Sequence, residues 1–221
     1  MRIIGIIGSP RGNKSSTLKL LESTLKGAAD AGAETEIVDI TRKKINYCKG
    51  CEACYGTGKC FQKDDFQEVF DKLAGADGFV LATPVYFNSV TAQLKTFMDR
   101  TSYSRHVFSL EGKYGMSVIT TAGSGIPETA DLLYKYTVDL GAFSIGNVGV
   151  GLPVIPANLE VGLKKAYEMG KDLADAINTK RQYPEQAERQ RSFLKTFKHV
   201  VKYNKEKWEP KYRHYVEKGW L

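Results

Sequence analysis

Residues 1–179 alternate between two kinds of segment, and no other property of the sequence restricts the fold as strongly. Strand-like segments cover residues 2–7, 34–40, 78–83, 114–121 and 143–150; the first and third are the most apolar, and Gly146 and Gly149 weaken the last. Segments with helical spacing of apolar residues separate or follow them at residues 15–31, 66–73, 90–101, 128–140 and 159–177. Strands and helices that alternate at this spacing predict a five-stranded, doubly wound parallel α/β sheet.

The C-terminal residues 180–221 differ from this pattern and form a second unit. They hold 12 Lys or Arg against 5 Asp or Glu, whereas residues 1–179 hold 20 of each kind. Residues 185–207 have the spacing of one long helix, and aromatic residues continue beyond it, at Tyr212, Tyr215 and Trp220. An aromatic surface of this size needs a cover. We expect a helical extension that packs on a neighbouring subunit, with the chain's own core as the alternative.

The position of the charge limits the classes of partner. The net charge of +7 belongs to the tail alone, which argues against a nucleic-acid-binding core. The tail is either a docking surface for an acidic partner or a solvated helix face. No apolar run reaches the length of a membrane span, and the N-terminus does not have the pattern of a signal peptide. We therefore expect a cytoplasmic protein that binds neither a membrane nor nucleic acid.

The loop between the first strand and the first helix has the composition of a phosphate site. Free backbone N–H groups at a helix N-terminus favour an anion, and hydroxyl groups and a guanidinium add hydrogen bonds. The candidate ligands are Ser9, Arg11, Ser15, Ser16 and Thr17. The loop matches neither the dinucleotide fingerprint nor the P-loop of nucleotide triphosphatases. A mononucleotide phosphate fits it best; the alternative is that these hydroxyls only cap the helix.

Two more loops are expected beside the first. In the strand order 2-1-3-4-5, ligands bind where the first and third strands diverge, at their carboxyl ends. The loop after the third strand offers aromatic surface for a flat ring, and the loop after the fourth is built of small residues. The candidate ligands are Thr83, Pro84, Val85, Tyr86, Phe87, Asn88, Thr121, Ala122, Gly123 and Ser124. Each loop alone is an ordinary turn, but together they suit a phosphate, a polyol and a flat heterocycle, which describes FMN.

All four cysteines of the chain lie within thirteen residues, between the second strand and the second helix. Cys48, Cys51, Cys54 and Cys60 have the spacing C-x2-C-x2-C-x5-C. Compact runs with two-residue gaps are similar to the cysteine ligands of bacterial ferredoxins, which predicts an iron–sulfur cluster. Zinc more often uses two separated pairs, and the thiols can also be free.

Other residues with catalytic potential lack a chemical pattern. His106, His199 and His214 show no ligand spacing, so we interpret them as surface or packing residues. Asp99 and Arg100 end a helix, and we expect them to pair with each other or with a neighbouring subunit. No acid–base signature is present, so the chemistry is expected to belong to the cofactors.

These motifs together resemble the iron–sulfur flavoproteins within the NAD(P)H-dependent FMN reductase group. The motifs are Gly8-Ser9-Pro10-Arg11 with Ser16-Thr17, the cysteines with Asp64-Asp65, Pro84-Val85-Tyr86, and residues 95–100. The resemblance covers residues 1–178. It implies a flavodoxin-like fold, FMN held by the three loops and a [4Fe–4S] cluster on the four cysteines. It also implies a homodimer or homotetramer in which the cluster and flavin of adjoining subunits lie close together.

The function expected on these grounds is electron transfer. An FMN-dependent oxidoreductase with a [4Fe–4S] cluster would relay electrons between one-electron and two-electron partners, and the resemblance suggests ferredoxin as the donor. The main alternative is a cluster-free NAD(P)H-dependent FMN or quinone reductase. A third interpretation is a non-catalytic carrier whose tail docks a partner.

Overall fold

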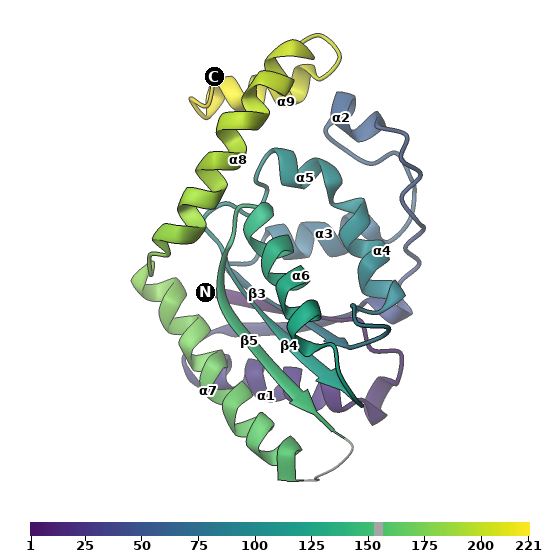
Figure 1. Ribbon diagram of the computed structural model, residues 1–221, viewed down its shortest axis with the longest axis vertical. Coiled ribbons are helices and arrows are strands. Elements are labelled where there is room, and N and C mark those ends of the chain that lie inside the picture. The colour runs from purple at the N-terminus through teal and green to yellow at the C-terminus, as the bar shows by residue number, and fades with distance from the viewer. Residues whose placement is uncertain (153–156) are drawn as a thin grey trace.

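A five-stranded parallel sheet forms the centre of the computed structural model, which describes residues 1–152 and 157–221 (Figure 1). The strand order is β2-β1-β3-β4-β5, and each neighbouring pair is parallel. The strands are β1 (Arg2–Ile7), β2 (Glu34–Asp39), β3 (Gly78–Pro84), β4 (Tyr114–Thr121) and β5 (Phe143–Gly151). The predicted fold class and strand order are confirmed, and the strand boundaries differ from the prediction by at most one residue.

Helices cover both faces of this sheet. One apolar cluster joins α1 (Ser16–Asp30) and α7 (Ala157–Thr179) to one face, and a second joins α3 (Phe66–Ala74), α4 (Ala92–Arg100) and α6 (Ile126–Asp139) to the other. Successive side chains of β1 alternate between the two clusters, with Ile3 and Ile7 in one and Ile4 and Ile6 in the other. This alternation follows from the two-residue period of a strand. The central strands β1, β3 and β4 are buried on both faces, which explains why they are largely apolar.

Two glycines allow α1 and α7 to pack closely. A Cβ atom at Gly27 would lie 1.9 Å from the carbonyl oxygen of Tyr167, and one at Gly170 would lie 1.8 Å from that of Thr24. Real Cβ atoms do not approach backbone oxygens so closely, and a backbone atom cannot move aside as a flexible side chain can. The helix pair therefore requires both glycines at its crossing point.

Replacing Gly170 by alanine should destabilise the protein by about 2–3 kcal/mol, because the helices must separate by enough to admit a methyl group. The better helix propensity of alanine, about 1 kcal/mol, offsets only part of this loss. For a chain of this length the melting temperature should fall by roughly 4–12 °C. Glu168→Ala on the same helix is the control, since its side chain is exposed and the expected change is within about 0.5 kcal/mol. A Gly170→Ala protein as stable as the wild type would contradict the close-packing account.

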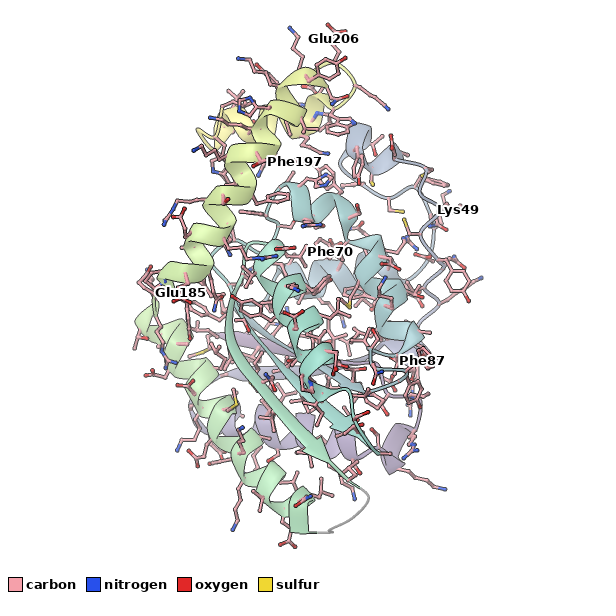
Figure 2. All side chains as sticks on the ribbon, in the orientation of Figure 1. Lys49, Phe70, Phe87, Glu185, Phe197 and Glu206 are labelled. Carbon is pink, nitrogen blue, oxygen red and sulfur yellow. The ribbon has the colours of Figure 1, made fainter. Side chains whose placement is uncertain are left out.

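The C-terminal extension consists of two helices, α8 (Pro184–Tyr203) and α9 (Glu209–Glu217). Phe193 stacks on Phe108 at a centroid distance of 5.7 Å, and the hydroxyl of Tyr215 donates to the carbonyl of His106 at 2.7 Å. Phe197 on α8 packs against His106 of α5, with ring centroids 4.2 Å apart (Figure 2). Within one chain, the extension therefore packs much of its aromatic surface against the α/β domain. Packing on a neighbouring subunit stays a prediction that concerns side chains left exposed.

Two further short helices, α2 (Ala53–Thr57) and α5 (Ser102–His106), lie beneath this extension (Figure 1). Neither was predicted from the sequence, and the long tail helix, expected to reach residue 207, ends at Tyr203. None of the helices in the part of the chain that the structure describes has both the length and the apolar character needed to cross a bilayer.

Candidate functional site

A cavity of about 280 Å³ opens at the carboxyl ends of β1, β3 and β4. It brings the three predicted loops together, as expected for a site at the point where β1 and β3 diverge. The lining residues are Ser9, Arg11, Ser15, Ser16, Thr17, Pro84, Val85, Tyr86, Thr120, Thr121, Ala122 and Leu152. Thr120 and Leu152 were not among the predicted residues. None of the described residues that line this cavity is acidic, so it favours an anionic ligand.

The N-terminus of α1 forms one wall of this cavity. Ser15 caps the helix by accepting a hydrogen bond from the Leu18 amide at 3.2 Å, and its own hydroxyl donates to Ser9 Oγ at 2.8 Å. The hydroxyls of Thr17 and Thr120 are hydrogen-bonded at 2.6 Å and link the first loop to β4. Capping and anion binding are therefore compatible here, because one hydroxyl caps the helix while Ser16 and Arg11 line the cavity.

Five predicted residues of these loops do not line the cavity: Thr83, Phe87, Asn88, Gly123 and Ser124. The Thr83 hydroxyl accepts from the Thr91 amide at 3.2 Å and so anchors the start of α4. Thr121 Oγ1 accepts from the Gly123 amide and donates to the Ser124 carbonyl, which shapes the β4 loop. Contact of these five residues with a ligand stays a prediction.

The loop after β3 ends in a tight two-residue turn. Tyr86 and Ser89 exchange backbone hydrogen bonds at 2.9 and 3.1 Å, and both intervening residues have positive φ, +50° at Phe87 and +58° at Asn88. Such a turn normally contains glycine. The Phe87 side chain is fully exposed and projects from the surface (Figure 2). Of the two aromatic residues expected to face a flat ring, only Tyr86 lines the cavity.

All four cysteines line a second cavity, of about 250 Å³, on the loop between β2 and α3. Within residues 1–152 and 157–221, no three His, Cys, Asp or Glu side chains are grouped as ligands of a single metal ion. Burial raises the pKa of the Cys54 thiol, and the neighbouring cysteines raise it further. Glu52 has a left-handed backbone, as do Gly50 and Gly58, so the loop turns sharply between its cysteines.

A buried ion pair supports this cysteine loop. Arg100 donates to Asp64 at 2.7 Å, and these side chains are 1% and 0% exposed. A second guanidinium nitrogen of Arg100 lies 3.2 Å from Cys60 Sγ, and the first also donates to the Asn46 carbonyl at 2.9 Å. The expectation that Arg100 pairs with Asp99 is wrong, because Asp99 pairs with Lys95, one helical turn away. Arg100 is therefore a residue of the cysteine site that was not predicted from the sequence.

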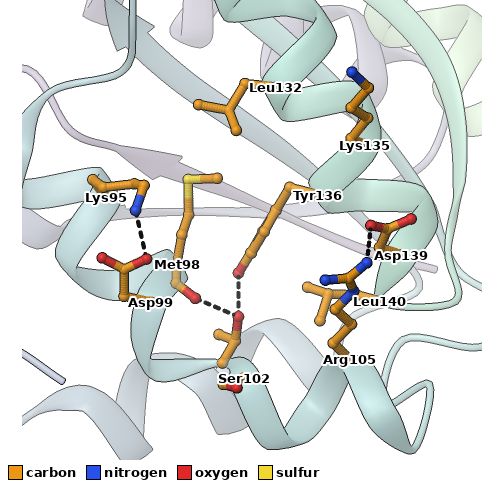
Figure 3. A pocket seen from close by; sticks show the side chains of 11 residues that line it. Lys95, Met98, Asp99, Ser102, Arg105, Leu132, Lys135, Tyr136, Asp139 and Leu140 are labelled. Carbon is orange, nitrogen blue, oxygen red and sulfur yellow. Dashed lines mark hydrogen bonds and ion pairs between the residues drawn. The ribbon is translucent and has the colours of Figure 1, made fainter. Parts of the chain in front are cut away.

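A third cavity, of about 340 Å³, lies between α4, α5 and α6 (Figure 3). Its charged side chains already have partners: Lys95 pairs with Asp99 at 2.6 Å, and Arg105 pairs with Asp139 at 2.9 Å. The Tyr136 hydroxyl accepts from Thr101 at 3.2 Å. None of the predicted cofactor ligands lines this cavity.

The fold and the first cavity define a class of protein: a flavodoxin-like α/β protein with a mononucleotide-sized, anion-favouring site at the switch point of its sheet. The chain belongs to the NADPH-dependent FMN reductase family, which matches residues 1–154. It is therefore an FMN-dependent oxidoreductase.

Individual relatives agree with this assignment. The chain is 41% identical to an iron–sulfur flavoprotein of Archaeoglobus fulgidus, over 96% of this chain and 99% of that protein. It is 35% identical to an iron–sulfur flavoprotein of Methanocaldococcus jannaschii, over 80% of this chain and 97% of that one. Among solved structures, an NAD(P)H:quinone oxidoreductase from Methanothermobacter marburgensis shares the fold with a TM-score of 0.65 and 18% identity, over 78% of this chain and 98% of that chain.

Proposed function

We propose that this oxidoreductase relays electrons between FMN and a [4Fe–4S] cluster held by Cys48, Cys51, Cys54 and Cys60. The observation that carries the proposal is that all four cysteines line one cavity. The names of the relatives from Archaeoglobus fulgidus and Methanocaldococcus jannaschii support it. FMN accepts one or two electrons and a cluster passes one at a time, so the pair connects one-electron with two-electron partners.

The residues around the cysteines fit an anionic, thiolate-held group. Arg100 lines the same cavity, and its Nε is buried without a hydrogen-bond partner in the described part of the chain. Its Nη2 already lies within hydrogen-bond distance of Cys60. Positive charge and N–H donors directed at cluster sulfurs stabilise the cluster and influence its potential. Arg100 would thus hold the cysteine loop in place through Asp64 and place a positive charge beside the cluster.

The first cavity fits FMN in the same way. The α1 N-terminus and the hydroxyls of Ser9, Ser16 and Thr17 would hold the phosphate, with Arg11 adding positive charge. Pro84 to Tyr86 would lie along the flat ring, and the small residues after β4 would let backbone N–H groups approach it. These residues bind and orient the cofactor; none is proposed to donate or accept a proton.

Analysis of iron and acid-labile sulfide in protein purified without oxygen tests the cluster assignment. About four of each per FMN are expected, and Cys54→Ser should lose most of both while it retains FMN. Ser102→Ala is the control, because Ser102 lines the same cavity without a thiol. Zinc in place of iron, or four titratable free thiols in the fresh protein, would refute the cluster.

The second candidate is a cluster-free NAD(P)H-dependent FMN or quinone reductase, which the family match over residues 1–154 favours. Rapid bleaching of the flavin by NADPH in an iron-free preparation would select it. Reduction by another protein alone, without turnover of small molecules, would instead indicate a carrier.

Salt should slow electron transfer from an acidic protein donor of the ferredoxin class. Basic side chains on and just after α8 form no ion pair with another described residue: Lys195, Lys198, Lys202 and Lys205. Steered association weakens as salt screens the charges, so we expect the rate to fall about tenfold between roughly 50 and 500 mM salt. Lys195→Gln/Lys202→Gln should flatten this dependence, whereas Lys164→Gln/Lys165→Gln on α7 should not. A rate that ionic strength leaves unchanged would contradict a docking role for the tail.

A homodimer or homotetramer is part of the proposal. The exposed tail residues Tyr203 and Val216 and the exposed Phe87 are the apolar side chains that a second copy would cover.

A further inference from the structure

Lys211 on α9 is a buried lysine in an aromatic cage. Its side chain is fully buried, and its ammonium lies 3.8 Å from the centroid of the Trp208 ring and 4.0 Å from that of Tyr55. His106 Nδ1 is 3.0 Å from the ammonium. No carboxylate in residues 1–152 or 157–221 lies within ion-pair distance of it. The tail therefore carries a positive charge into the protein interior without a paired anion.

This arrangement is unfavourable for folding by itself. Burial lowers the pKa of Lys211 to about 8, against the opposing influence of Cys54 and Glu52. Burial, assisted by the charge of Lys211, also lowers the pKa of His106 to about 3, so the imidazole is neutral and accepts the hydrogen bond at neutral pH. Cation–π contacts recover part of the lost hydration of an ammonium. A methionine or leucine would fill the same space without a desolvated charge.

The cage lies against the cysteine loop. Tyr55, one of its walls, follows Cys54 directly in α2, and its hydroxyl is hydrogen-bonded to Ser102 at 2.8 Å. Lys207 pairs with Glu52 at 3.3 Å, on the other side of Cys54. The backbone of Gly56 packs against the Lys207 carbonyl, where an added Cβ would lie 3.1 Å away. The end of the tail thus contacts α2 through residues on either side of Cys54 in the sequence, Glu52 and Tyr55. Figure 1 shows α2 close to the turn between α8 and α9.

We infer that Lys211 is the built-in counter-charge of the cysteine site and that it sets the reduction potential of the cluster bound there. The inference rests on the proposed function. A cluster held by four thiolates becomes more negative when it accepts an electron. The buried ammonium of Lys211 lies over the ring of Tyr55, the residue that follows Cys54, and it would stabilise the reduced state of the cluster more than the oxidised one, because the interior screens the interaction weakly. Two further cations, Arg100 and Lys49, line the cavity itself, and Arg100 lies beside Cys60.

A redox titration of the full-length holoprotein, followed by the electron paramagnetic resonance of the reduced cluster, tests this role. Lys211→Met should lower the equilibrium constant for one-electron reduction at least tenfold, which is a shift of 59 mV or more toward negative potential. Lys211→Arg keeps the positive charge, so its reduction potential should lie close to that of the wild type. Lys207→Met removes one charge from the same end of the tail, but Lys207 is 68% exposed, so its potential should stay near that of the wild type.

A second readout separates charge from packing. The melting temperature of Lys211→Met apoprotein should equal or exceed that of the wild type, because methionine removes a desolvated ammonium. A lower melting temperature with an unchanged potential would make Lys211 a packing residue and overturn the inference. Should Lys211→Met not fold, Lys211→Gln provides the same comparison. Iron-free wild-type protein would overturn the proposed function together with this inference, whereas full iron content with equal potentials would overturn the inference alone.

Discussion

Replacing Ser16 by aspartate is expected to weaken FMN binding about a thousandfold. Ser16 is the first residue of α1 and lines the cavity where the phosphate is proposed to bind. Two like charges about 4 Å apart repel by about 4 kcal/mol at the effective dielectric constant of a protein surface, which corresponds to a factor of about a thousand in affinity. An aspartate in the first turn of a helix otherwise stabilises it, so the fold should not suffer.

The control for this variant is Asn13→Asp. Asn13 lies in the same loop, and Asn13→Asp adds the same charge, but Asn13 is exposed and does not line the cavity. Titration of apoprotein with FMN, followed by quenching of the flavin fluorescence, measures both affinities. If Ser16→Asp bound FMN within about threefold of the wild type, the phosphate would lie elsewhere.

Replacing Asp64 by asparagine is expected to destabilise the apoprotein by about 3–5 kcal/mol, because Arg100 is then left charged, buried and unpaired. For a chain of this length, the melting temperature should fall by roughly 6–20 °C. Asp99→Asn is the matched control: the Asp99–Lys95 pair is about half exposed, and its loss should change the stability by less than about 1 kcal/mol. Equal stabilities of the two variants would show that the buried pair does not hold the loop.

Lowering the pH should also show how much the Asp64–Arg100 pair stabilises the fold. Burial alone would raise the pKa of Asp64, but hydrogen bonds from Arg100 and from the Asn46 and Phe66 amides outweigh it and lower the pKa to about 2. A carboxyl whose pKa is lower in the folded state stabilises the fold above its ordinary pKa of 3.8. That contribution is lost as the pH falls toward 2. Wild-type apoprotein should therefore lose stability over this range more steeply than Asp64→Asn.

The sheet and its main helices could be predicted from the sequence because the central strands β1 and β3 are buried on both faces and read as nearly continuous apolar runs. The short helices α2 and α5 could not, since five residues are too few for a periodic pattern. Both are held by contacts with the tail and with each other, such as the hydrogen bond between Tyr55 and Ser102. This hydrogen bond joins residues 47 apart in the sequence and the tail contacts join residues farther apart, which local spacing does not reveal.

The residues of the two sites also differ in whether the sequence predicts them. The first cavity was predictable because a parallel sheet brings its loops together by topology, whatever their sequences. The turn that leaves Phe87 exposed could not be predicted from the sequence, because neither Phe87 nor Asn88 is glycine. Arg100 and Lys211 escaped prediction for another reason: their partners lie 36 and 105 residues away, and Asp99 is a misleading neighbour. A pairing rule for adjacent charges fails where one of them points into the protein.

A reductive titration of the protein purified without oxygen tests the central claim most directly. Stoichiometric reductant is added while the flavin and cluster absorbance are followed, and the electrons consumed are counted per FMN. An FMN and a [4Fe–4S] cluster in each chain should together accept about three electrons, two on the flavin and one on the cluster. A count of about two, with no signal from a reduced cluster, would contradict the relay and leave an FMN reductase without a cluster.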